Sequence, residues 1–385
     1  MTGATRSSGW RQEREMSEVI TYRAPGRTEI IGNHCDHQNG CVIAAAINLY
    51  IEAAVQPSDD GRVLIRQEGH PPVDISLHDT GIRKEECGLS RSLVRGVADY
   101  FIREGYRLRG FTANVDSHVP VGSGVSSSAA YEILIGRILT DLSDRGQADP
   151  VSLALAGRYA ESEYFGKPSG LMDQMAIAAG GLTYMDFADP GHPVSERLDF
   201  DVEDFGYRLC LINTGGSHAG LTDQYASIPR EMQAVARCFG QDVLRNVRRE
   251  DFYSELLSVR ERAGDRALLR AAHFFDENDR VLQMREAVRE RDIDRFLLLV
   301  RESGRSSHEL LQNICPAGAV TDQSLALGLL AAEKVLDGAG ACRVHGGGFA
   351  GTIQAYVPRD AEELFKERME LLFGAGSCRF VSVAF

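Results

Sequence analysis

Basic residues are in short supply in this chain of 385 residues. Lysine and arginine together number 42, against 55 aspartates and glutamates, which gives a formal net charge of -13, and no basic cluster stands out. Nucleic acids and anionic membranes attract basic surfaces, so both are poor partners for such a chain. We expect neither, and the sequence leaves the oligomeric state, monomer or homodimer, open.

Long apolar runs are absent as well. No run approaches the roughly 18 residues needed to span a bilayer, and the N-terminal segment lacks the hydrophobic core of a secretory signal. The eight cysteines are scattered without any C-x-x-C pair, so neither a disulfide framework nor a thiolate zinc site is indicated. Composition therefore predicts a cytoplasmic protein with reduced thiols.

The chain does have enough hydrophobic residues, 43%, to bury a large core, and more length than one compact core usually holds. We expect two domains, at residues 19–195 and 196–385, after a polar lead-in at residues 1–18. The division is placed near the turn Asp189-Pro190-Gly191, which follows a strand-like run.

Strand-like and helical patterns are mixed along the chain. Residues 49–55 and 63–67 are predicted strands, joined as a hairpin by the turn at 58–61. Residues 91–104 and 129–142 carry apolar side chains at helical spacing. The second half predicts helices at 225–238, 252–263, 280–288, 293–306 and 326–336, and strands at 353–357 and 380–385. This mixture indicates an α+β fold.

A loop rich in glycine and serine is the most informative segment. It runs from Pro120 through Gly122-Ser123-Gly124-Val125-Ser126-Ser127-Ser128 directly into a helical pattern. Glycines let the backbone approach a polyphosphate, and the first amides of a helix have no partner within the helix, so this arrangement suits an anion. The loop lacks the G-K-[ST] ending of a Walker A motif and the third glycine of a dinucleotide fingerprint. It is a predicted phosphate site outside both of those classes.

With this loop in view, the chain resembles the GHMP kinase superfamily, whose phosphate loop reads P-x-G-x-G-[LV]-[SG]-S-S-A. Two further family motifs lie on either side of the loop in the expected order, GRTEIIGNHCD at residues 26–36 and GGGFAG at residues 346–351. The first of these, and GLMDQ at residues 170–174, are similar to the galactokinase branch, which typically reads G-R-V-N-L-I-G-E-H-T-D-Y and G-I-M-D-Q. The resemblance covers residues 21–385.

The resemblance implies a two-domain GHMP kinase architecture, with an N-terminal ribosomal-protein-like and a C-terminal ferredoxin-like α+β domain. It also implies phosphorylation of the C1 hydroxyl of galactose by ATP with Mg²⁺. By position, Asp173 would accept the proton of the sugar hydroxyl, and Arg27 would orient it and offset charge. The matching magnesium positions are Ser128 and Glu161, the latter chosen over nearby Glu163 by its spacing.

The resemblance also implies a set of positions that contact the sugar. These positions are Glu29, Asn33, His34, Cys35, Asp36 and Tyr225, and two of them depart from the family pattern. Where galactokinases have the glutamate that contacts the sugar this chain has Asn33, and where they have asparagine it has Glu29. Four residues apart on an extended strand, the two point to the same side, so a swapped amide and carboxylate can meet the same partners.

Several alternatives stay open at this stage. The exchange allows a kinase of another sugar, such as N-acetylgalactosamine, galacturonate or arabinose. A sugar and ATP sensor without turnover is disfavoured, because the serine run, Arg27 and Asp173 are all present. The text His34-Cys35-Asp36-His37 also resembles a metal site, but the sequence shows no third cluster of ligands to complete it. The stretch at residues 273–281 is expected to serve packing, and the glycines at 346–348 to support the wall of the site.

Overall fold

The computed structural model describes residues 19–120, 124–167, 169–216 and 220–384. Its strands are β1 (Ile20–Ile31), β2 (Cys41–Ser58), β3 (Arg62–Gln67), β4 (Val73–Ser76), β5 (Gly110–Ser117), β6 (Leu182–Asp186), β7 (Val194–Leu198), β8 (Tyr207–Asn213), β9 (Ala341–Val344), β10 (Thr352–Pro358) and β11 (Cys378–Val381). The predicted lead-in at residues 1–18 lies outside the described residues.

The helices follow the same chain order. They are α1 (Ser90–Arg103), α2 (Ser127–Asp141), α3 (Pro150–Tyr159), α4 (Met172–Ala179), α5 (Thr222–Cys238), α6 (Arg249–Ser254), α7 (Leu256–Ala263), α8 (Asp265–Arg289), α9 (Ile293–Ser306), α10 (Ser324–Leu336) and α11 (Glu362–Phe373). Short 3₁₀ segments are η1 (Asp36–Gln38), η2 (Lys84–Glu86), η4 (Val202–Phe205), η5 (Leu244–Asn246) and η7 (Arg359–Ala361), and η3 (Ala160–Phe165) and η6 (Ser307–Leu311) are π-helical.

In the described residues, the first sheet has seven strands in the order β4-β3-β5-β2-β6-β7, with β1 paired to β2. The hairpin predicted through residues 58–61 is wrong, because β5 lies between β2 and β3: Ala113 pairs with Val55 on one side and with Ile65 on the other. The turn does reverse the chain, but β3 forms its hairpin with β4 instead. A local turn signal cannot show that a later strand, with Phe111, Ala113 and Val115 buried, will occupy the place between them.

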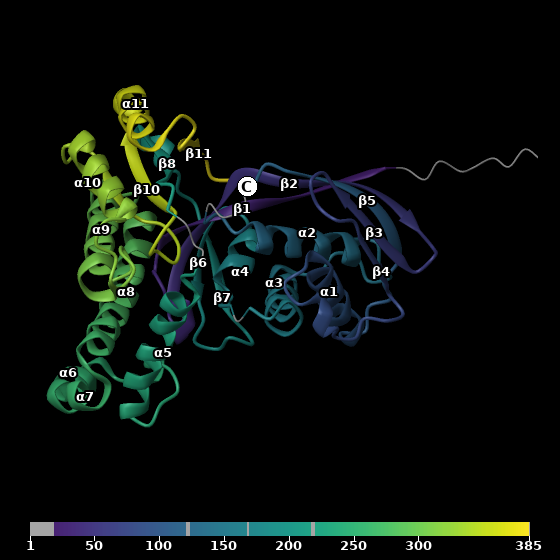
Figure 1. The fold of residues 1–385 in the computed structure, drawn as a ribbon, viewed down its shortest axis with the longest axis horizontal. Coiled ribbons are helices and arrows are strands. Elements are labelled where there is room, and N and C mark those ends of the chain that lie inside the picture. Colours follow the sequence, from purple (N-terminus) through teal and green to yellow (C-terminus); the bar gives the residue numbers. More distant parts are fainter. Residues whose placement is uncertain (1–18, 121–123, 168, 217–219, 385) are drawn as a thin grey trace, which may run out of the picture.

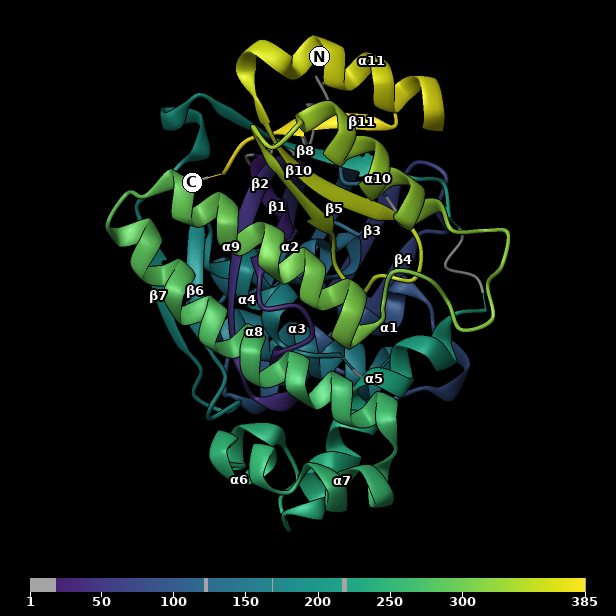
Figure 2. The ribbon, with the colours of Figure 1, turned by 90° about the vertical axis from the view of Figure 1, so that its left-hand side faces the viewer.

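Helices cover both faces of this first sheet. Figure 1 shows α1 to α4 gathered on one side of it, where α2 and α4 pack against β1 and β2. Figure 2 shows α8 and α9 crossing in front of β1 and β2 from the other side. Because both faces are covered, β1 and β2 carry long runs of buried residues rather than a simple alternation.

The second sheet has the order β11-β8-β10-β9, with every neighbouring pair antiparallel. Helices α10 and α11 pack beside it. The C-terminal segment returns to the first sheet, where Ala384 N–H donates to Ala46 O at 2.8 Å and Gly181 N–H donates to Ala384 O at 2.8 Å. The two sheets are therefore tied together by the end of the chain.

The predicted α+β class is confirmed, and the element boundaries differ in detail. Helix α9 has the predicted bounds, whereas the helix expected at 252–263 is two helices that meet at Glu255, and the one expected at 280–288 is the end of the longer α8. The last strand ends at Val381. The domain division at 195/196 stays a prediction, and β7, which pairs with β6 in the first sheet, crosses it.

Two further observations concern what lies away from the predicted site. Within the described residues, no helix is both long and apolar enough to cross a bilayer.

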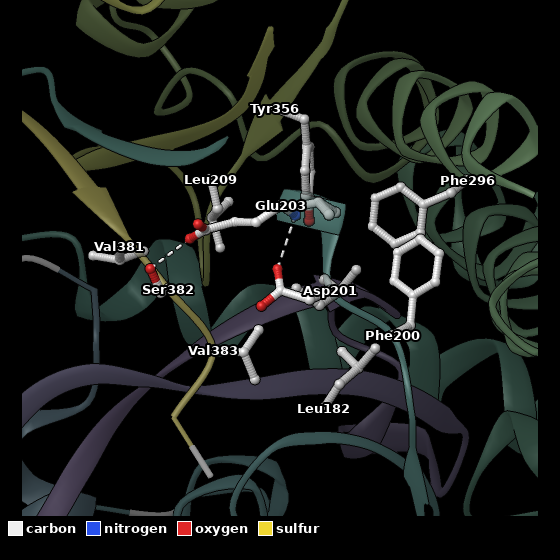
Figure 3. Close-up of a pocket in the computed structure, with 12 residues that line it drawn as sticks. Leu182, Phe200, Asp201, Glu203, Leu209, Phe296, Tyr356, Val381, Ser382 and Val383 are labelled. Carbon is white, nitrogen blue, oxygen red and sulfur yellow. Dashed lines mark hydrogen bonds between the residues drawn. The ribbon is translucent and has the colours of Figure 1, made fainter. Parts of the chain in front are cut away.

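A pocket between the two sheets is lined mainly by apolar side chains, among them Phe200, Phe296 and Tyr356 (Figure 3). At its edge Glu203 accepts a hydrogen bond from Ser382 Oγ at 2.6 Å. None of the predicted site residues lines this pocket, so it belongs to the packing between the sheets.

Candidate functional site

An arginine–aspartate pair joins the first strand to the fourth helix. Arg27 on β1 donates from Nε to Asp173 Oδ1 and from Nη2 to Asp173 Oδ2, both at 2.8 Å, which is a bidentate pair. Asp173 lies in the first turn of α4, and its side chain is 33% exposed, so a ligand can reach the carboxylate. Burial alone would raise the pKa of Asp173, but the Arg27 guanidinium and the Ser126 hydroxyl outweigh it and hold that pKa below its usual value. The carboxylate is therefore ionised.

The phosphate loop meets this pair directly. Arg27 N–H donates to Val125 O at 3.1 Å, Arg27 Nη1 donates to Gly124 O, and Ser126 Oγ donates to Asp173 Oδ2. Gly124 and Ser126 both have left-handed backbones, with φ of +77° and +59°. Gly122 and Ser123 were also predicted to bind phosphate, and they lie outside the described residues.

Helix α2 begins immediately after the loop, at Ser127. In the described part of the chain no side chain caps its N-terminus, so its first amides keep the capacity to donate to an anion. The helix dipole favours negative charge at the same place. These features of the described part of the loop and of α2 suit an anion, and phosphate binding there stays a prediction.

A hydroxyl and a carboxylate, at the two predicted magnesium positions, meet beside the loop. Ser128 Oγ donates to Glu161 Oε1 at 3.2 Å, and Glu161 lies on the π-helical η3, a local geometry often found at functional sites. Lys167 Nζ donates to the same oxygen at 2.8 Å, and Gln174 Nε2 donates to Glu161 Oε2 at 3.0 Å. Glu163, the alternative, is exposed. Oxygen donors of this kind fit Mg²⁺ bound mainly by phosphates and water.

The sugar motif is arranged differently, because Glu29 and Asn33 face a buried network. Asn33 Nδ2 donates to Glu29 Oε1 at 3.2 Å and to Gly346 O at 2.7 Å, and Asn33 Oδ1 accepts from Asn313 Nδ2 at 2.8 Å. Glu29 in turn pairs with Arg343 at 2.7 Å, and both side chains are fully enclosed. The two exchanged residues do lie on one side and contact each other, but their polar atoms are taken up within the protein.

Burial raises the pKa of Glu29, and the Arg343 guanidinium beside it acts in the opposite direction. A carboxylate held this way is turned toward the second sheet rather than toward a ligand. All the polar groups of the Asn33 amide are thus paired within the protein, and its role as a sugar contact stays a prediction.

The next residues of the motif differ in how far a ligand can reach them. His34 Nε2 lies 3.1 Å from Gly347 O, and burial, followed by His37, lowers the pKa of His34 to about 3, so the ring is neutral. Cys35 is fully buried, so its thiol cannot contact a sugar here and only its backbone is left for that role. Burial raises the pKa of the Cys35 thiol, with the Glu277 charge as the next cause, so the thiol is also unreactive.

Asp36 brings the sugar motif to the segment that carries Asp173. A side chain at Gly170 would place its Cβ only 1.8 Å from Asp36 Oδ2, so only glycine fits beside this carboxylate. Asp36 Oδ1 accepts the His37 N–H at 2.9 Å, which orients the side chain. Asp36 is thus well placed among the predicted sugar residues. In the described residues no three metal-ligating side chains gather, at residues 34–37 or elsewhere.

Tyr225 and the glycine turn at 346–348 close the site from the second half of the chain. Tyr225 Oη donates to Gly348 O at 2.8 Å, and a Cβ at Gly347 would lie 2.7 Å from the tyrosine ring. The ring therefore packs closely against the glycine backbone, and the role of this turn in the wall of the site stays a prediction. Tyr225 also stacks edge-on against Phe349, with ring centroids 5.4 Å apart.

The sequence missed several residues that hold these groups in place. Glu277 of α8 accepts the N–H groups of Gly32 and Asn33 at 3.0 and 3.3 Å, and His273 Nε2 lies 3.0 Å from Asn33 O. The expected packing role of the stretch at 273–281 is in line with these contacts. Arg343, Lys167, Gln174 and Asn313 were not singled out either. Of these four residues, only Gln174 lies in a motif that the sequence had identified, GLMDQ at residues 170–174.

Comparisons with known proteins agree with this geometry. Residues 92–181 match the family model "GHMP kinases N terminal domain", and residues 12–57 match the "Galactokinase galactose-binding signature". The chain is 31% identical over 357 residues to a galactokinase of Glaesserella parasuis, covering 90% of this chain and 87% of that one. It is 32% identical over 363 residues to a galactokinase of Actinobacillus pleuropneumoniae, covering 90% and 87%.

Solved structures share the fold. The Lactococcus lactis galactokinase complexed with galactose superposes with a TM-score of 0.80 at 23% identity, covering 95% of this chain and 94% of that one. The Methanococcus jannaschii mevalonate kinase superposes with a TM-score of 0.65 at 14% identity, covering 96% and 99%. At these identities the likeness establishes the fold alone, and it confirms the predicted GHMP kinase architecture.

Proposed function

The chain belongs to the galactokinase family, and from that premise we propose that it transfers the γ-phosphoryl group of ATP to the C1 hydroxyl of galactose, giving galactose 1-phosphate and ADP. One observation carries the proposal. The ionised, partly exposed Asp173 is held by Arg27 and by Ser126 of the phosphate loop, so a proton acceptor stands beside the place where phosphates would bind.

Asp173 is the proposed catalytic base. Its carboxylate takes the proton of the sugar hydroxyl, and Arg27 orients that carboxylate and offsets the negative charge that develops during phosphoryl transfer. Phosphoryl transfer depends mainly on positioning and on charge stabilisation, so a fixed carboxylate and a fixed cation meet its needs.

The phosphates are held by the chain from Gly124 to Ser128 and the first amides of α2. Magnesium, when bound with ATP, would neutralise charge on the phosphates, and Ser128 and Glu161 are the residues that would hold it. Lys167 also pairs with Glu161, at 2.8 Å, and balances its charge. The sugar is proposed to lie near His34, Asp36 and Tyr225. A cytoplasmic location stays a prediction.

A second candidate is a kinase of a related sugar. The observation that favours it is the network around Asn33: where the family has a glutamate for the sugar, this chain has an amide whose groups are bound to Glu29, Gly346 and Asn313. A site that lacks this acceptor loses the discrimination that a hydrogen-bonding partner gives against altered sugars. N-acetylgalactosamine, galacturonate and arabinose are therefore the analogues to compare with galactose.

The test is a coupled ADP-release assay with ATP and Mg²⁺ across galactose, those three sugars, galactosamine and glucose. We expect turnover of galactose, with kcat/KM for at least one analogue within about tenfold of it if the Asn33 network relaxes specificity. Preference for galactose by several orders of magnitude would remove the second candidate. Saturable binding of ATP and sugar without turnover would instead favour a sensor and refute the kinase proposal.

A further inference from the structure

Lys167 is an exposed cation that lies over the carboxylate at the predicted magnesium position. Its backbone N–H donates to Glu161 O at 3.0 Å, and its ammonium donates to Glu161 Oε1 at 2.8 Å. The Lys167 side chain is 62% exposed, whereas that of Glu161 is 4% exposed. Gln174 Nε2 donates to the other oxygen of Glu161 from the buried side, at 3.0 Å. The oxygen left for a ligand is therefore Oε1, which accepts from both Lys167 and Ser128.

The same ammonium acts on the proposed catalytic base. Partial desolvation would lower the pKa of Lys167, but Glu161 and, after it, Asp173 outweigh this and raise that pKa, so the group is charged. In return, Lys167 adds to the effect of Arg27 in lowering the pKa of Asp173. One exposed cation thus acts on both the metal position and the carboxylate that meets the acceptor hydroxyl. In phosphoryl transfer, the group that moves lies between a metal and an acceptor of this kind.

Binding of magnesium changes what Lys167 can pair with. An ammonium and a divalent cation repel each other when they share one carboxylate oxygen, so a metal held by Glu161 weakens the Lys167 pair. Asp173 is already held by Arg27 through two hydrogen bonds, and burial raises the pKa of Glu132, which favours its neutral form. Lysine has a flexible four-carbon stem, so the ammonium can leave Glu161 while the backbone stays in place. The anions then left within its reach are the phosphates of the nucleotide.

We propose that Lys167 is a catalytic residue: its ammonium pairs with Glu161 in the free enzyme and moves to the γ-phosphoryl group of ATP when magnesium and nucleotide are bound. This inference rests on the proposed kinase function. Negative charge is spread over the γ-phosphoryl oxygens in the transition state, so a cation that reaches them lowers the barrier. In the free enzyme the same cation keeps the enclosed Glu161 carboxylate paired. Lys167 lies between Glu161 and GLMDQ, outside the motifs that the family resemblance assigns.

The first test compares nucleotides with and without a terminal phosphate. Isothermal titration at saturating Mg²⁺ measures the Kd of ADP and of the non-hydrolysable analogue AMP-PNP for the wild type, Lys167→Met and Lys167→Arg. We expect Lys167→Met to weaken AMP-PNP binding about tenfold and ADP binding less than about twofold, because one hydrogen bond between charged groups is lost. Lys167→Arg keeps a cation and should recover part of the loss. Lys334→Met, at an exposed lysine of α10, is the control.

The second test separates phosphate binding from simple pairing with Glu161. Because Lys167→Met frees Glu161 for the metal, the Mg²⁺ concentration for half-maximal activity should fall about threefold, while kcat should fall about 10²-fold. A lysine that only pairs with Glu161 would lower the Mg²⁺ requirement and leave kcat and AMP-PNP binding unchanged, and that result would overturn the proposal. Equal weakening of ADP and AMP-PNP binding would overturn it as well.

A third readout uses the wild-type protein and needs no variant that could unfold. The chain has four lysines, at residues 84, 167, 334 and 366, so reductive methylation followed by mass spectrometry can report on each. Mg²⁺ with AMP-PNP should slow the labelling of Lys167 about tenfold, and Mg²⁺ with ADP less than about twofold, with the other three lysines as internal references. Equal protection by both nucleotides would contradict the proposal. Binding and labelling require no sugar, so a wild type that selects AMP-PNP through Lys167 but phosphorylates no sugar would refute the proposed function alone.

Discussion

The motif at residues 26–36 is divided between two regions of the molecule that are built in opposite ways. At its start, Arg27 joins Asp173 and the loop in a group that a ligand can reach. Further along, Glu29 and Asn33 are enclosed with Arg343, and their polar atoms are paired within the protein. One short stretch of sequence thus supplies a reactive region and a structural region. The difference teaches that position in a family motif does not by itself say which groups meet a substrate.

The largest expected effect comes from the reactive region. Asp173→Asn removes the proton acceptor and the charge that Arg27 faces, so we expect kcat to fall about 10³-fold. The measurement is ADP release at saturating ATP and sugar. Unchanged AMP-PNP binding serves as the control, and a melting temperature above the assay temperature shows that the variant is folded. A fall of less than tenfold would mean that the carboxylate only positions the loop.

The structural region should respond in stability instead. Asn33→Glu brings a second carboxylate to the place where the amide lies 3.2 Å from Glu29, and a buried charge without a partner is costly, so the free energy of unfolding should drop by about 3 kcal/mol. The double variant Glu29→Asn/Asn33→Glu restores one carboxylate and one amide and should recover at least half of that loss. Urea unfolding measures both. Losses that simply add in the double variant would show that the two side chains do not interact.

The buried histidines of both regions should lower the free energy of unfolding as the pH falls. His34 and His345 each have a pKa lowered to about 3, against about 6.5 when unfolded, so below pH 6.5 the unfolded chain binds more protons and stability falls as the pH falls. Together they should remove about 2 kcal/mol between pH 6.5 and 5.5. His345→Gln should remove about half of the loss that these two histidines cause, and the exposed His192→Leu variant is the control. An equal slope in His345→Gln would mean that the ring is protonated in the folded state.

The smallest effect concerns the metal positions. Glu161→Gln keeps the shape of the side chain but removes the charge beside Ser128, so the Mg²⁺ concentration for half-maximal activity should rise about tenfold. Glu163→Gln, on the same η3 segment but exposed, is the matched control and should change it less than twofold. The titration is run at fixed ATP. Similar shifts in both variants would point to a general field of negative charge rather than to a magnesium ligand.

The predictable part of the site is the part encoded over short stretches. The loop from Gly124 to Ser128 and the start of α2 follow from glycine, serine and helical spacing, and the family motifs located Arg27 and Asp173. Which residues bind the substrate and the metal stays a prediction that the variants above test. The pairing of Glu29 with Arg343 was not predictable, because 314 residues separate them and the local sequence around Arg343 does not indicate its partner.

The same limit applies to the fold. The α+β class followed from mixed periodicities, but the place of β5 between β2 and β3 did not, because the turn at 58–61 is equally compatible with a simple hairpin. Pairing between distant strands is decided by which apolar faces can be buried together, and a local pattern does not contain that information.

The sequence by itself determined the family, the phosphate loop and the arginine and aspartate that meet beside it, because these depend on residue types held in short motifs. Only the tertiary structure decided that Glu29 and Asn33 turn inward while Arg27 stays at the site, and that His345 comes to lie against Gly124. The physical reason is that burial and pairing depend on the whole set of neighbours around a side chain. Those neighbours come from β9, the glycine turn and α8, far along the chain.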